Sequence, residues 1–388
     1  MPAQPSMPNT AQLAPQKGLS LKENFDDQNS AFAIRLPDDF PLQDLFEISS
    51  CLNEVDVCVP GYIPPEVGLY HPYGYFYEHE VEYIKTMLIP DRNVVSRFAQ
   101  LAQGKPVQKD QHLRTAAGLL GFCQCLDIEI EPAIAFHELA HKEGNEVALA
   151  ELEWFRAADS ANTQDLMDVG LIRKDALVGD YSPRKVEAHD LAKPLKRWNR
   201  NYILALKMME LELRRTKPID RVLTLLDWMR EDFMFGGPAA LLASVYFAPN
   251  SPPKKRVFKD KNSADREKAI AGVRNAAWDL TQLSEFLRKV NEASEEGHTR
   301  YLFASFDKHL RLMARLALKF GPSRLASAGL SSALSEWWPV DEANRITDCI
   351  FDHLDRINSS QWTVKTAPAP DFINQLIRAG EQSIREFC

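Results

Sequence analysis

The sequence predicts an α/β fold built on a central, mainly parallel sheet. Two short apolar runs, Met87–Ile89 and Tyr301–Phe306, have the composition of strands buried in a sheet. Each run leads to an acidic residue, Asp91 and Asp307 respectively, and then at once to the start of an amphipathic helix. Buried strands followed directly by helices are typical of parallel sheets.

Composition limits the class of protein. A chain of 388 residues with 45% hydrophobic and 26% charged residues is long enough for one large or two modest soluble domains. The formal charge of −8 gives no overall basic field, so any nucleic-acid surface must be local. Six scattered cysteines favour a reducing, cytoplasmic setting over a disulfide framework. We expect neither a membrane span nor a secretory leader, because no apolar segment has the required length.

The N-terminal segments are expected to be peripheral. Residues 1–30 are rich in Pro, Gln, Ser and Asn and lack an apolar period, which predicts a flexible tail. Residues 31–80 hold short apolar pieces and an aromatic group that either packs as an arm on the sheet edge or offers stacking platforms for bases. This group comprises Tyr70, Tyr73, Tyr75, Phe76 and Tyr77.

Asp91 and Asn93 follow the first predicted strand and precede a helix whose apolar side carries Val94, Phe98 and Leu101. Ligands of open parallel sheets bind at the carboxyl ends of strands, so Asp91 lies where chemistry is expected. An Asp-x-Asn sequence also forms ordinary turns and helix caps, and this motif alone favours a structural role.

A second helix is predicted over His112–Leu126, where Cys123 and Cys125 suit small apolar positions better than metal ligation. A third is expected to begin at Pro132 and to continue through Leu149 and Phe155.

The third helix contains His137-Glu138-Leu139-Ala140-His141, a literal H-E-x-x-H. Residues four apart share a helix face, so His137 and His141 could hold Zn²⁺ while Glu138 serves as general base. Two alternatives remain: an ordinary helix face with two exposed histidines, or a role for Glu138 alone.

Residues 150–262 are predicted to be largely helical and carry local basic clusters. Solvated helix faces explain such clusters more often than a groove that follows a phosphate backbone. They comprise Lys193, Lys196, Arg197 and Arg200, then Arg214, Arg215 and Lys217, and the segment 252–262.

Further acids and helices follow. Asn275 and Asp279 are four apart within the predicted helix Gly272–Phe286 and therefore share a face. Two C-terminal amphipathic helices, Asp341–Ile357 and Asp371–Phe387, are expected to pack on the sheet or to form a partner or dimer surface.

Taken together, these motifs resemble those of the PIN-domain metallonucleases. In that family an Asp ends the first strand, often as D-x-N, and is followed by a helical acid. A second helical Asp then precedes a strand that ends with a hydroxyl residue two positions before another Asp. The corresponding residues here are Asp91 with Asn93, Glu138, Asp279, and Ser305 with Asp307.

The resemblance implies a PIN-like three-layer sandwich over 81–320, with a helical insertion at about 150–262 and a C-terminal helical segment at 321–388. It also implies cleavage of RNA, or else single-stranded DNA, with Asp91, Glu138, Asp279 and Asp307 as the catalytic and metal-binding acids.

Hard oxygen ligands favour Mg²⁺ or Mn²⁺, whereas the peptidase alternative would place Zn²⁺ at His137 and His141. Asn93, Asn275 and Ser305 would support the site. The separation of Glu138 from Asp279 is longer than the family usually shows, so Glu131, Asp159 or Asn275 could contribute in place of Glu138. A non-enzymatic helical module, whose acids only cap helices, is the third alternative.

Overall fold

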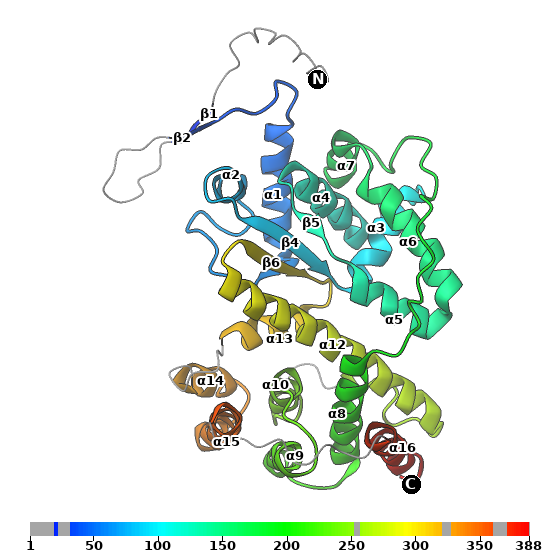
Figure 1. The fold of residues 1–388 in the computed structure, drawn as a ribbon, viewed down its shortest axis with the longest axis vertical. Coiled ribbons are helices and arrows are strands. Elements are labelled where there is room, and N and C mark those ends of the chain that lie inside the picture. Colours follow the sequence, from blue (N-terminus) through cyan, green and yellow to red (C-terminus); the bar gives the residue numbers. More distant parts are fainter. Residues whose placement is uncertain (1–18, 22–31, 252–256, 320–326, 360–370, 388) are drawn as a thin grey trace, which may run out of the picture.

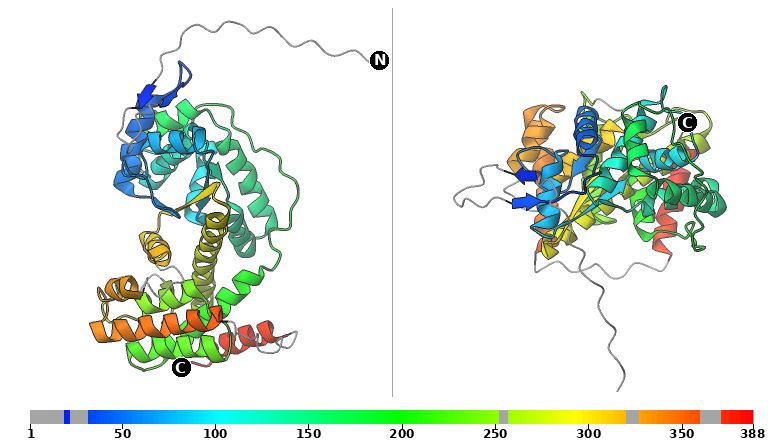
Figure 2. Two further views of the ribbon diagram at one scale, coloured as in Figure 1. Left: turned by 60° about the vertical axis from the view of Figure 1, so that its left-hand side comes forward. Right: turned by 90° about the horizontal axis from the view of Figure 1, so that it is seen from above.

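The computed structural model describes residues 19–21, 32–251, 257–319, 327–359 and 371–387. Most of the predicted tail and residues 252–256 of the last basic segment therefore lie outside the described residues. The described chain forms a sheet region and a helical region, with the long helix α12 (Arg266–Glu296) running between them (Figures 1 and 2). None of its helices is long and apolar enough to cross a membrane.

The central sheet has four strands in the order β3-β6-β4-β5. Their bounds are Cys58–Pro60 for β3, Thr299–Ala304 for β6, Lys85–Pro90 for β4 and Glu129–Ile130 for β5. β4 is parallel to both β5 and β6, and only β3 runs antiparallel, against β6. The predicted α/β class with a mainly parallel sheet is confirmed.

Strand register places the two predicted strand-end acids on one edge. Pro90 of β4 pairs with Ala304 of β6, so Asp91 and Ser305 follow at the same level. The second strand begins and ends two residues earlier than the predicted Tyr301–Phe306. Ser305 and Phe306 instead belong to the turn that leads into α13 (Lys308–Lys319).

Seven helices pack with the sheet in one hydrophobic core (Figure 1). Four phenylalanines, Phe98, Phe122, Phe136 and Phe155, fill its centre. The helices are α1 (Leu42–Val55), α2 (Pro72–Glu80), α3 (Arg92–Ala102), α4 (Gln111–Cys125), α5 (Ala133–Glu143), α6 (Asn145–Asp159) and α7 (Thr163–Gly170).

The single helix predicted from Pro132 through Phe155 is wrong. The chain forms two helices, α5 and α6, which are separated at Gly144. Gly144 has φ 100° and ψ 159°, a conformation that is open essentially to glycine alone. Apolar residues continue at helical spacing on both sides of the break, which is why the pattern concealed it.

The second hydrophobic core includes Val59, Ile89 and Phe303 of the sheet and continues between α12 and the remaining helices. α8 and α16 pack on α12, and α15 packs on α9 (Figure 2). The bounds are α8 (Lys196–Leu213), α9 (Pro218–Glu231), α10 (Gly237–Tyr246), α14 (Ser327–Leu334), α15 (Val340–Asn358) and α16 (Phe372–Arg385). The C-terminal helices are present, but α15 and α16 cover this second core and not the sheet.

The N-terminal aromatic group supports the packed-arm interpretation. Tyr70 and Tyr75 are buried, and both lie edge-on against Phe122 of α4. Tyr73 makes the same kind of contact with Phe46 of α1. Rings that are occupied in this way leave little face for a stacked base. A short antiparallel strand pair joins β1 (Leu19–Leu21), which lies within the predicted tail, to β2 (Phe32–Ile34) at the start of the arm.

Candidate metal centre

Asp91 is the buried centre of a hydrogen-bond network at the sheet edge. Its Oδ1 accepts from the backbone N–H of Arg92 at 2.7 Å, which caps α3. Its Oδ2 accepts from the Ser305 hydroxyl at 2.8 Å and from the Asn93 amide. A carboxylate has about four acceptor positions, so three bonds leave room for a further ligand.

Asn93 and Ser305 hold the ends of the two strands together. The Asn93 side chain donates to the Ser305 hydroxyl at 3.2 Å and accepts from the backbone N–H of Phe306 at 3.0 Å. Ser305 is fully buried and accepts from the backbone N–H of Asp307 at 3.0 Å. The turn after β6 is therefore fastened to the turn after β4, and Asp91 is held in one orientation.

Asp307 follows Ser305 and is half-buried. Its Oδ1 accepts from the backbone N–H of His309 at 2.7 Å at the start of α13. Asp307 and Asp279 line one narrow pocket of about 40 Å³. The last strand-end acid and the acid of α12 are thus brought to a common cavity.

Glu138 lies on α5 and is 7% exposed, although its neighbour Lys142 reaches into solvent. Lys142 Nζ donates to Glu138 Oε1 at 2.6 Å. The sequence predictions do not include this partner, although the Glu-x-x-x-Lys spacing is a known signal for a helical ion pair. The packing of α5 against α12 places Glu138 in the same electrostatic environment as Asp279.

Asp279 is open to solvent on one side and enclosed by protein on the others. Its carboxylate makes no hydrogen bond or ion pair with any other residue that the structure describes. Asn275, half-buried, lies one turn earlier on the same helix.

Burial and mutual repulsion raise the pKa values of two of the acids. Burial raises the pKa of Asp91 to about 7, and the charges of Glu138 and Asp307 add to the effect. Burial also raises the pKa of Asp279 well above its usual value, followed by the charges of Asp91 and Glu138. The charge of Asp307 raises the pKa of Asp279 further, and the charge of Lys142 lowers it.

The acids are gathered but not in contact. No three of them place ligand oxygens within 4.8 Å of one another in the described chain.

No family model, no curated protein and no solved structure matches this chain. The function must therefore be inferred from the geometry of the site.

The two histidines beside Glu138 have other neighbours. His137 Nδ1 lies 2.6 Å from the backbone oxygen of Leu191, and His141 Nδ1 lies 2.8 Å from that of His137. The His141 ring also stacks on Trp198. The described residues provide no third ligand that would complete a close group with these two rings.

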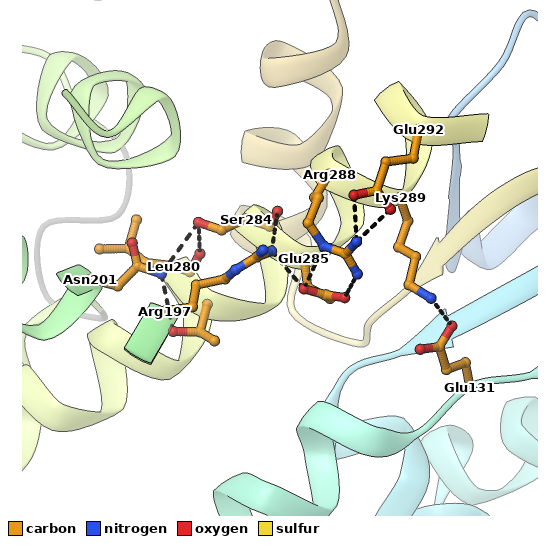
Figure 3. A network of polar contacts seen from close by, with 10 residues as sticks. Glu131, Arg197, Asn201, Leu280, Ser284, Glu285, Arg288, Lys289 and Glu292 are labelled. Carbon is orange, nitrogen blue, oxygen red and sulfur yellow. Dashed lines mark hydrogen bonds and ion pairs between the residues drawn. The ribbon is translucent and has the colours of Figure 1, made fainter. Parts of the chain in front are cut away.

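The alternative acids have separate roles. Glu131 follows β5 and forms an ion pair of 3.0 Å with Lys289 of α12 (Figure 3). On the same helix Glu285 binds Arg197, one of the predicted basic residues, at 2.6 Å. Asp159 lines a different pocket, beside Asp127 at the start of β5. The charge of Glu138 acts on both Asp91 and Asp279, whereas Glu131 and Asp159 are not among the charges that shift their pKa values, which favours Glu138 as the second acid.

Proposed function

We propose that this protein is a metal-dependent endonuclease that hydrolyses RNA, with a PIN-like arrangement of its acids around a mainly parallel sheet. The observation that supports it best is that four carboxylates from four segments lie near enough for their charges to raise the pKa values of Asp91 and Asp279. They are Asp91 after β4, Glu138 on α5, Asp279 on α12 and Asp307 after β6.

The charge balance of this group favours a bound cation. Lys142 forms an ion pair with Glu138, and its charge also lowers the pKa of Asp279, but Asp279 itself forms no ion pair in the described chain. Burial and repulsion hold the pKa of Asp91 near neutrality, so its negative charge is costly at physiological pH. A divalent ion would offset that cost for several carboxylates at once.

Oxygen-only ligands suit Mg²⁺ or Mn²⁺. Asp91, Glu138, Asp279 and Asp307 would hold the ion or ions, which would supply a Lewis acid and lower the pKa of bound water.

The surrounding residues have positioning roles in this proposal. Ser305 and Asn93 fix the Asp91 carboxylate through three hydrogen bonds that join the two strand ends. Fixed ligand orientation usually matters for metal affinity and activity. Capping alone explains the Arg92 N–H bond, but it does not explain the buried bonds from Ser305 and Asn93.

The direct test uses full-length protein stripped of metal with a chelator. A circular single-stranded RNA is incubated with Mg²⁺, Mn²⁺, Zn²⁺ or no metal, beside a circular single-stranded DNA of the same sequence. We expect linear RNA only with Mg²⁺ or Mn²⁺, the ions that oxygen ligands favour. A circle has no end for an exonuclease, so linear RNA would show endonuclease cleavage. Intact RNA under every condition would overturn the proposal, and preferential cleavage of the DNA would reassign the substrate.

A further inference from the structure

A second group of ligand-type side chains lies far from the carboxylates, where α9 meets α15. Asp227 of α9 and Cys349 and His353 of α15 place a carboxylate oxygen, Sγ and a ring nitrogen within 4.8 Å of one another. Cys349 and His353 are four apart, so they share one face of α15. Among the described residues, no other three side chains of these types place their ligand atoms this close to one another.

His353 calls for an explanation beyond packing. Its side chain is 3% exposed and its ring stacks on Phe235 at 5.5 Å. Its Nε2 is buried and has no hydrogen-bond partner in the described structure. A buried polar atom without a partner is destabilising, so such atoms usually have a function or a ligand.

The positions of Cys349 and Asp227 have ordinary structural explanations. Cys349 packs against the second hydrophobic core, and Asp227 forms an ion pair of 2.9 Å with Arg230 one turn later on α9. Neither explanation satisfies the His353 ring. A shared ligand would satisfy all three side chains.

We propose that Asp227, Cys349 and His353 form a binding site for Zn²⁺ or a similar borderline divalent transition metal. Their sulfur, nitrogen and oxygen atoms form a ligand set that zinc accepts, and a water would complete a four-coordinate site. Ligand atoms around a tetrahedral zinc lie roughly 3.5 Å apart, so the observed grouping needs only small side-chain movements.

Binding has a defined proton balance. Cys349 binds as thiolate and releases one proton, since burial raises its pKa to about 11 in the metal-free protein. His353 binds as the neutral ring, and Asp227 exchanges its contact with Arg230 for the metal. The ion would cross-link α9 and α15 and thereby stabilise the helical region. This ligand set contains soft sulfur, in contrast to the oxygen-only acids beside the sheet.

The test is a titration of reduced, metal-stripped, full-length protein with Co²⁺, which reports a cysteine ligand through a thiolate-to-cobalt charge-transfer band. We expect one equivalent to produce this band, with Zn²⁺ displacing it. Cys349→Ser should abolish the band, and His353→Asn should weaken binding more than about a hundredfold. Cys51→Ser changes another half-buried cysteine that lies outside the group and should have no effect.

Asp227→Asn keeps the test independent of folding, because the Asp227 side chain is 55% exposed. It should weaken Co²⁺ binding at least about tenfold while the protein stays folded. Absence of the band in the wild type, or equal affinity in the wild type and in either His353→Asn or Asp227→Asn, would overturn the proposal. RNA cleavage is not part of the readout, so the outcome is independent of the nuclease proposal.

Discussion

The Ser305 hydroxyl donates a hydrogen bond of 2.8 Å to the Asp91 carboxylate, although the two residues are 214 positions apart in the sequence. Both side chains are buried, and each follows a strand of the same parallel pair. A bond of this kind fixes the carboxylate against one strand end while Arg92 N–H holds it to the other. The predictions below test whether this orientation serves a metal site.

Asp91→Asn should reduce RNA cleavage at least about a hundredfold, because the amide keeps the shape but loses the charge that would hold a cation. In chelator its melting temperature should hold or rise, since the change removes repulsion with Glu138 and Asp307. Asp110→Asn is the matched control, because Asp110 caps the neighbouring helix α4 and should leave cleavage unchanged. Equal loss in both variants would indicate a structural cause.

The stability of metal-free protein should fall as pH rises from about 4 to 7. The pKa of Asp91 is 3.8 in the unfolded reference and about 7 in the folded protein. Between these values the folded state binds more protons, so unfolding becomes easier as pH increases. The expected loss is on the order of a few kcal/mol, measured by urea unfolding in chelator. Asp91→Asn should flatten this slope, and an unchanged slope in that variant would contradict the assignment.

Ser305→Ala should weaken Mn²⁺ binding and slow cleavage by about 10–100-fold, because Asp91 loses one of the bonds that orient it. The control is Ser244→Ala, which removes another fully buried hydroxyl, one that donates to Ala240 within α10. Isothermal titration with Mn²⁺ and a cleavage assay on both variants provide the comparison. A similar loss in Ser244→Ala would attribute the effect to general destabilisation.

The double variant His137→Ala with His141→Ala should keep most of the cleavage, whereas Glu138→Gln should lose it. Positions 137 and 141 nearly coincide around a helix, while position 138 is about 100° away, so the two faces can be used separately. Elemental analysis accompanies the assay. Zinc that disappears in the double variant, together with lost activity, would support the peptidase alternative instead.

Part of this site could be predicted from the sequence because its signals are local. An apolar run that ends in Asp-x-Asn is enough to place Asp91 and Asn93 at the end of a strand. A second apolar run that leads to Asp307 puts both acids on one edge, provided that the two strands are parallel neighbours. Their register, with Pro90 opposite Ala304, supplies that condition.

The break at Gly144 has a local signal, a glycine that follows His141 and Lys142 in the last turn of α5, but the apolar spacing that continues on both sides outweighed it. Other features depend on tertiary contacts that no local pattern encodes. Asp227, Cys349 and His353 meet because α9 packs on α15, and their distant positions carry no joint motif. The exposure of Asp279 likewise follows from how α12 crosses the sheet edge.

The central claim is that the acids at the sheet edge bind a hard divalent cation. The most direct measurement is Mn²⁺ binding, followed by electron paramagnetic resonance, in chelator-stripped Cys349→Ser protein with and without Asp279→Asn. The Cys349→Ser background removes the second proposed site. We predict that Asp279→Asn weakens Mn²⁺ binding at least about tenfold, because the proposed site uses the Asp279 carboxylate as a direct ligand. Equal Mn²⁺ affinity in the two proteins, or no binding in either, would contradict this account.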